Sequence, residues 1–204
     1  MYTPAAFAEP RVEAMHDLMR RYSLASVVAM TGSGLVANHI PLLIQSDSTP
    51  YGTLQGHIAR ANPLWRSFQP EVDALAIFQG PDAYITPEWY ATKQETGKVV
   101  PTWNYAVVHA HGTLRIIDDA AWVRHQIEQL TAAHEAASAT PWELTDAPAG
   151  FIESLLPAVV GIEITITRLE GKWKASQNQP ECNRAGVVAG LTARQCPTTL
   201  AWPA

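Results

Sequence analysis

The part of the chain richest in groups that could do chemistry runs from Val99 to Gly112 and reads VVPTWNYAVVHAHG. Trp and Tyr bring flat apolar surfaces with one polar group each, and Asn and His are costly to bury without hydrogen-bond partners. A strand that only filled a core would not combine them. The segment therefore predicts a site for a planar ligand with polar edges. Its candidate binding residues are Thr102, Trp103, Asn104, Tyr105 and His109.

Three other segments have a similar composition. They read GHIARANPLW over residues 56–65, AYITPEWYATK over residues 83–93 and GKWKASQNQ over residues 171–179. Their candidate binding residues are His57, Arg60, Asn62, Thr86, Trp89, Lys93, Lys174, Ser176 and Gln177. His39 is the last candidate, and it lies on a strand that we expect beside the segment 56–65.

The four segments together resemble one family, the FMN-binding negative transcriptional regulators of the PaiB type. Its members carry HLARANPQW, YISPSWY, VPTWNY..VH and KLSQN at similar separations, and the likeness runs from Met1 to about Leu191. The resemblance implies an FMN cofactor, the FMN-binding split-barrel fold, and a homodimer with the flavin near the subunit interface. The sequence departs from the family at Ala175, where leucine is usual, and at Gln179, where a basic residue often follows.

Arg60 is the residue we expect at the FMN phosphate. It precedes the helix start at Asn62 and Pro63, where free backbone N–H groups and the positive end of the helix dipole favour an anion. His57 lies three residues earlier and adds a donor. In the alternative interpretation Arg60 is a surface charge and Asn62 is only a cap.

The other candidates also have two interpretations. Lys93 either reaches a phosphate or is a solvated loop lysine, while Trp89 binds the ligand or anchors a dimer. His39 either meets the polar edge of the isoalloxazine or bonds to a backbone carbonyl. Lys174, Ser176 and Gln177 bind the flavin or form a capped loop before the last helix.

Alternation along the strand splits its candidates between two faces. Trp103, Tyr105, His109 and His111 project one way, and Thr102 and Asn104 the other. Either the strand bends, or one face meets the ligand and the other meets the barrel interior or a second subunit. A metal chelated by His109 and His111 with His39 or His57 is a less favoured alternative, and no metal is predicted.

Strand patterns dominate the first half of the chain, and the turns between them are too short for parallel crossovers. Helices are expected over residues 9–22, from 62, over 118–137, 149–156 and 181–191. Strands are expected over residues 25–31, 35–44, 52–59, 74–78, 83–85, 102–117 and 159–168. These patterns favour an antiparallel barrel with peripheral helices. The resemblance narrows this to a six-stranded, Greek-key-like split barrel in one domain over residues 1–204, with a C-terminal helix and tail from about residue 181.

Composition limits the partners. The net charge of −5 argues against a dedicated surface for duplex DNA, because Lys and Arg supply most nucleic-acid affinity. DNA binding is implied only by the family's name. No window is apolar enough to span a bilayer, and no basic region with an apolar run begins the chain, so we expect no membrane contact and a cytoplasmic location.

No nucleophile lies beside a base in the sequence, so catalytic residues stay unassigned. Three functions remain. The first is an FMN-binding homodimer that acts as a redox- or metabolite-linked regulator. The second is a flavin-dependent oxidoreductase that uses NAD(P)H and a small acceptor, and the third is a structural dimer that has lost the flavin.

Overall fold

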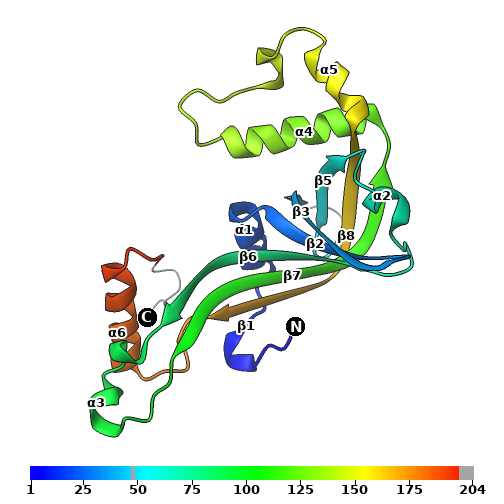
Figure 1. Ribbon diagram of the computed structural model, residues 1–204. Coiled ribbons are helices and arrows are strands. Elements are labelled where there is room, and N and C mark those ends of the chain that lie inside the picture. The colour runs from blue at the N-terminus through cyan, green and yellow to red at the C-terminus, as the bar shows by residue number, and fades with distance from the viewer. Residues whose placement is uncertain (47–48, 198–204) are drawn as a thin grey trace. The chain divides into compact units, whose positions relative to one another are not determined.

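The computed structural model describes residues 1–46 and 49–197 of the chain (Figure 1). The chain divides into two compact units. The terminal unit contains residues 1–18, 79–109 and those from 170 onward, and the central unit contains residues 19–78 and 110–169. Residues 198–204 of the predicted tail lie outside the described residues.

Eight strands form one mainly antiparallel sheet in the order β3-β2-β6-β7-β8-β5-β4, with β1 paired to β8. The strands are β1 (Ala8–Glu9), β2 (Leu24–Thr31), β3 (Gly34–Pro41), β4 (Leu43–Gln45), β5 (Thr53–Ala59), β6 (Ala74–Ile85), β7 (Thr102–Ile117) and β8 (Val159–Lys174). The predicted fold class, mainly β with peripheral helices, is confirmed, although the sheet has eight strands where six were expected.

The helices lie between and after the strands. The α-helices are α1 (Val12–Arg21), α2 (Leu64–Ser67), α3 (Thr92–Thr96), α4 (Ala120–Glu135), α5 (Phe151–Leu155) and α6 (Glu181–Ala193). Short 3-10 helices are η1 (Ala5–Phe7), η2 (Pro87–Trp89), η3 (Leu144–Asp146) and η4 (Leu156–Ala158). Each predicted helix is present, with ends that differ by a few residues. No helix among the described residues is long and apolar enough to span a membrane.

The central unit is built on the β2–β3 hairpin and on β5 paired with β4 and β8. The hairpin turns at Gly32 and Ser33, as predicted, and Pro41 ends the edge strand β3, where a missing N–H is tolerated. Strand β3 also contacts β5, so the sheet curves in this unit. Helix α4 contacts β5, and its N-terminus is capped by Asp119, whose carboxylate accepts from the Trp122 N–H at 2.7 Å.

The terminal unit contains a small apolar core between the end of β6 and helix α6, which lie side by side in Figure 1. Ile85, Tyr90, Val187 and Leu191 are its most buried members. Trp89 packs directly on α6, because a Cβ on Gly190 would lie 2.2 Å from the indole ring. This core fixes α6 against the segment that follows β6.

Four local predictions were wrong, and strand pairing explains two of them. The strand expected over residues 35–44 is divided into β3 and β4. Gly80 and Pro81 do not interrupt the sheet, since β6 is continuous where two short strands were expected. Gly80 packs against Leu18 and Ala106, where a side chain would collide. Strand β8 continues to Lys174 because β1 pairs with Gly171 and Lys172. Residues 88–98, for which the sequence predicts neither a helix nor a strand, contain α3.

Candidate functional site

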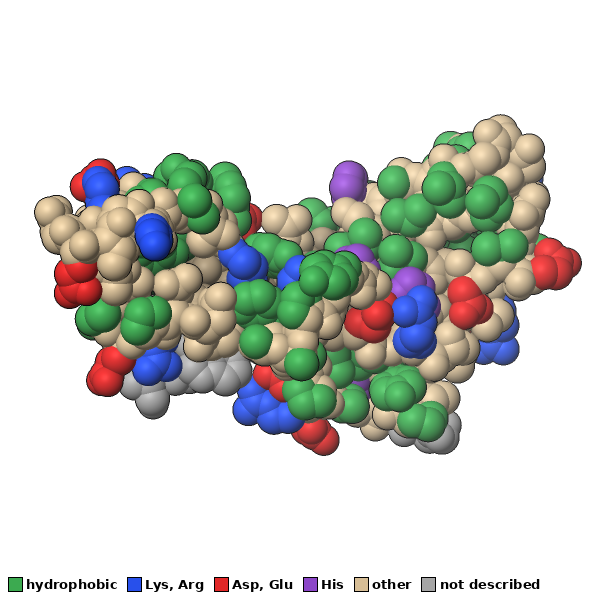
Figure 2. All heavy atoms as spheres, turned by 90° about the horizontal axis from the view of Figure 1, so that it is seen from below, with side chains coloured by type: hydrophobic (Ala, Val, Ile, Leu, Met, Phe, Trp, Pro, Cys, Tyr) green, Lys and Arg blue, Asp and Glu red, His purple; other side chains and the backbone are tan. Residues whose placement is uncertain are grey.

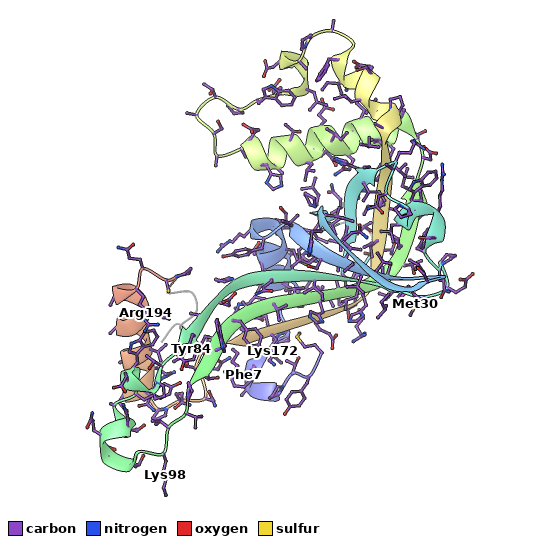
Figure 3. All side chains as sticks on the ribbon, viewed as in Figure 1. Phe7, Met30, Tyr84, Lys98, Lys172 and Arg194 are labelled. Carbon is purple, nitrogen blue, oxygen red and sulfur yellow. The ribbon has the colours of Figure 1, made fainter. Side chains whose placement is uncertain are left out.

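A polar pocket of about 320 Å³ lies in the terminal unit, between the start of β7 and the segment after β8. It brings together residues from three of the four unusual segments, those at 83–93, 99–112 and 171–179, although Thr102 and Lys174 are 72 positions apart in the chain. Its lining residues are Tyr90, Thr92, Lys98, Val99, Val100, Thr102, Asn104, Lys174, Ser176, Asn178, Gln179, Pro180 and Asn183. In Figure 3, Lys98 projects from the chain that follows α3.

Lys174 places a cation in this pocket. Its ammonium donates to the Thr102 hydroxyl and, at 2.6 Å, to the Trp103 carbonyl, both of which are neutral acceptors. No carboxylate forms an ion pair with it in the described part of the chain. Partial burial, and to a smaller degree the charge of Lys172, hold the pKa of Lys174 below its usual value of 10.5. An anion would therefore supply the counter-charge that this ammonium lacks.

Asn104 and Ser176 form a buried pair at the base of the pocket. The Asn104 amide donates to Ser176 Oγ at 2.9 Å, and Asn104 is fully buried. Ser176 has a φ of 61°, a left-handed conformation that is costly for a residue with a side chain. Strain of this kind persists where the surroundings fix the backbone, and it concentrates at functional sites.

Gln177 fixes the backbone of this turn rather than lining the pocket. Its Oε1 accepts from the Ala175 N–H at 2.7 Å, and its Nε2 donates to the Trp173 carbonyl at 2.5 Å. Both bonds are to backbone groups within three residues of Ser176. In this structure Gln177 holds Ser176 in place.

Sequence reasoning missed the part of the pocket that α6 provides. Asn183 is 2 % exposed, and its amide donates to Thr92 Oγ1 at 2.9 Å and to Gln179 Oε1 at 3.1 Å. An asparagine among the buried apolar positions of the predicted helix was the signal that could have found it. Tyr90, which belongs to the unusual segment 83–93, lines the same pocket. Burial raises the pKa of its phenol more than the hydrogen bond with Ser176 lowers it.

Thr86, Trp89 and Lys93 lie in the terminal unit but do not line the pocket. The Thr86 hydroxyl caps η2 by accepting from the Glu88 N–H, and the ammonium of Lys93 pairs with the Glu88 carboxylate. Trp89 is enclosed by α6, and the guanidinium of Arg194 lies 4.8 Å from its ring centroid. These three residues shape and anchor the segment before the pocket.

The predicted alternation along β7 holds at its start. Thr102 and Asn104 face the pocket, whereas Trp103 is 52 % exposed and meets the ring of Tyr84 edge-on at 5.9 Å. Lys172, labelled near Tyr84 in Figure 3, lies 5.2 Å from the ring of Tyr105. His109 follows on β7 and is half-buried. Trp103 therefore points away from the pocket that Thr102 and Asn104 line.

Arg60, in the central unit, already has a counter-charge. Its guanidinium donates to both Asp118 oxygens at 2.6 and 3.0 Å, and also to the carbonyls of Pro157 and Val159. The hydrogen bond with Arg60 holds the pKa of Asp118 below its usual value, while Asp118 raises that of Arg60. An incoming phosphate would have to displace a bidentate carboxylate.

The other candidates of the central unit also have partners within it. Nδ1 of His57 lies 2.7 Å from Gln126 Oε1, and Nδ1 of His39 lies 3.0 Å from Ser26 Oγ. Asn62 donates to Asn38 and accepts from the Leu64 N–H, which is the capping role considered from sequence. The site residues predicted from sequence thus fall into two groups, one in each unit.

The similarity of this chain to known proteins shows the family to which it belongs. Residues 1–168 match the family described as "Putative FMN-binding domain". The chain is 34 % identical to an uncharacterized protein of Emericella nidulans, with 94 % of this chain and 90 % of the relative covered. It is 29 % identical to the "Protease synthase and sporulation protein PAI 2" of Bacillus subtilis, with 97 % and 92 % covered.

A solved structure with a similar fold is the FAD and heme binding protein from Mycobacterium smegmatis. It is 17 % identical, with a TM-score of 0.60, and the similarity covers 82 % of this chain and 73 % of that one. This likeness shows the fold, which is the flavin-binding split barrel. The chain therefore belongs to the FMN-binding-domain family, which includes the PaiB protein of Bacillus subtilis and whose cofactor is FMN.

Proposed function

We propose that this protein is an FMN-binding homodimer that acts as a redox- or metabolite-linked regulator, and that the pocket of the terminal unit holds the FMN phosphate. One observation carries the assignment of the site. The Lys174 ammonium is partly buried, has only neutral acceptors and lies in a pocket lined by hydroxyls and amides. A phosphate dianion supplies the charge that this environment lacks.

The donors present fit FMN. Lys174 provides the cation, Thr102 and Ser176 provide hydroxyls, and Asn178 provides an amide for the phosphate and the ribityl chain. A volume of about 320 Å³ is small for a ligand pocket, so it encloses part of FMN rather than all of it. When bound, the flavin supplies electron-transfer chemistry, and the residues named here bind it, orient it and keep a cation beside its phosphate.

The exposed aromatic pair supports the homodimer. Trp103 and Tyr84 are 52 % and 43 % exposed and lie on neighbouring strands of the terminal unit. Large aromatic side chains are enriched in interfaces between subunits. The pair faces away from the pocket, so a second copy can cover it without filling the flavin site. Exchange of Trp103 for alanine should then shift the mass in solution from dimer to monomer.

The distribution of charge favours regulation through a ligand or a protein partner over a duplex-binding surface. Net charge is −5, and on the face shown in Figure 2 the basic side chains form small separate groups among hydrophobic and acidic ones. Cys182 and Cys196 are free thiols, which supports a cytoplasmic location as part of this proposal.

The experiment is a titration of the apoprotein with FMN and, in parallel, with riboflavin, which lacks the phosphate. Flavin fluorescence reports binding, and light scattering reports mass. We expect one FMN per subunit, a dimeric mass and weaker binding of riboflavin. Equal affinity for both flavins would reject the phosphate assignment. Steady NAD(P)H consumption by the FMN complex would instead indicate an oxidoreductase.

A further inference from the structure

A buried amide in the central unit lacks a hydrogen-bond acceptor. Gln126, on α4, is 1 % exposed, and its Oε1 lies 2.7 Å from His57 Nδ1. Its Nε2 has no partner among the described residues. Buried amide groups in folded proteins are almost always paired, so an unpaired one suggests an absent ligand or water. Gln126 lines a pocket of about 230 Å³ beside α4.

The rest of this pocket is rich in side-chain amides. Gln45 Nε2 donates to Gln129 Oε1 at 3.1 Å, and Gln55 Nε2 donates to Glu163 at 3.0 Å. Gln45 Oε1, Gln55 Oε1 and the Gln129 amide nitrogen keep hydrogen-bonding capacity. The lining contains no carboxylate, ammonium or guanidinium among the described residues, and His125 is its one titratable member. The pocket therefore suits a neutral ligand with both donors and acceptors.

Trp122 supplies a flat wall. A Cβ on Gly161 would lie 2.4 Å from Trp122 Cζ3, so the indole packs directly on the backbone of β8. This contact fixes the ring, which is half-buried and also lines the pocket. A fixed indole beside amide groups favours a planar heterocycle over a flexible or saturated ligand.

We propose that this pocket binds a small, neutral, planar heterocycle with a ring carbonyl, of the nucleobase class, whose oxygen accepts from Gln126 Nε2. None of its residues lines the flavin pocket. Gln45 and Gln129 also line a neighbouring pocket of about 480 Å³ with Leu42 and Ile44, which leaves room for a substituent on the ring. Its use as the effector site of the regulator rests on the proposed function, whereas the binding itself does not.

The test is a titration followed by NMR of the side-chain amides in ¹⁵N-labelled protein, with and without FMN. The probes are uracil and hypoxanthine, which carry ring carbonyls, and adenine, which lacks one. We expect a saturable shift of the Gln126 amide with the first two and about tenfold weaker binding of adenine. The titration without FMN tests binding of the heterocycle by itself, so its outcome does not depend on whether the protein binds FMN.

Gln126→Glu tests the donor itself. The variant keeps an oxygen for His57 and replaces the donating nitrogen with an acceptor, so we expect at least about tenfold weaker binding of uracil. Gln94→Glu, on the exposed surface of α3, makes the same charge change and should leave binding unchanged. The proposal fails if no probe gives a saturable shift at millimolar concentration, if the shift survives in Gln126→Glu, or if only a long-lived water is detected at the Gln126 amide.

Discussion

Arg60 and Lys174 are two cations in two units of one chain, and their surroundings are opposite. Arg60 donates to both oxygens of Asp118, while Lys174 donates to a hydroxyl and a carbonyl. From sequence Arg60 is the stronger phosphate candidate, because it precedes a helix start. The structure favours Lys174, because an anion is attracted to a charge that is not already balanced. Whether a cation is available to bind a phosphate therefore depends more on whether a carboxylate already pairs with it than on its position before a helix start.

The largest expected effect comes from removing the unbalanced cation. Lys174→Met keeps the length of the stem but loses a charge-assisted hydrogen bond, which is worth about 1.5–3 kcal/mol, so FMN affinity should fall about 10- to 100-fold. Riboflavin affinity should change little, since riboflavin has no phosphate. Fluorescence titration of both flavins measures the two effects. Unchanged FMN affinity in Lys174→Met would show that Lys174 does not bind the FMN phosphate.

Next in size is the loss of the buried pair beneath Lys174. Asn104→Ala leaves the Ser176 hydroxyl without its amide donor, and an unsatisfied buried group costs about 1–3 kcal/mol of stability. We expect a lower Tm by calorimetry and weaker FMN binding. Gln94→Ala, an exposed change in the same unit, is the control and should leave Tm unchanged. A stable variant with normal FMN binding would show that the pair is dispensable.

A smaller effect is expected from pH. In the proposed site the ammonium form of Lys174 binds the FMN phosphate. The pKa of Lys174 lies below the usual lysine value, so its charged fraction falls at a lower pH than for an exposed lysine. FMN binding should therefore weaken as pH rises toward the usual lysine pKa, and should begin to weaken at a lower pH than a site built on an exposed lysine would. Lys174→Arg should flatten this dependence because the guanidinium stays charged. Riboflavin has the same isoalloxazine ring but no phosphate, so its binding over the same pH range shows how much of the change comes from titration of that ring.

The smallest effect on binding should come from Arg60. Arg60→Met removes a cation that is already paired with Asp118, so FMN affinity should change by less than about threefold. Stability should fall slightly, since the pair is largely exposed. A loss of FMN affinity as large as that of Lys174→Met would reverse the comparison and support the phosphate site expected from sequence.

The parts of the fold that depend on local signals were predictable. The bounds of β7 match the prediction. Asp119 caps the N-terminus of α4, close to the start that the sequence predicts for this helix. The cofactor followed from the resemblance. What could not be predicted depends on distant pairing: Asp118 reaches Arg60 across 58 positions, and β1 extends β8 to Lys174. The contribution of α6 to the pocket was also hidden, because Asn183 meets Thr92 only in the folded chain.

The position of the pocket has a consequence for comparing relatives. The family match ends at residue 168, yet Lys174, Ser176 and Asn183 lie beyond it. A protein can therefore satisfy the family match and still differ at six of the thirteen residues that line the proposed flavin pocket. Classification by the matched segment reports the barrel, while the segment from Lys174 to Asn183, whose helix packs on Trp89 through two glycines, supplies the rest of the pocket lining.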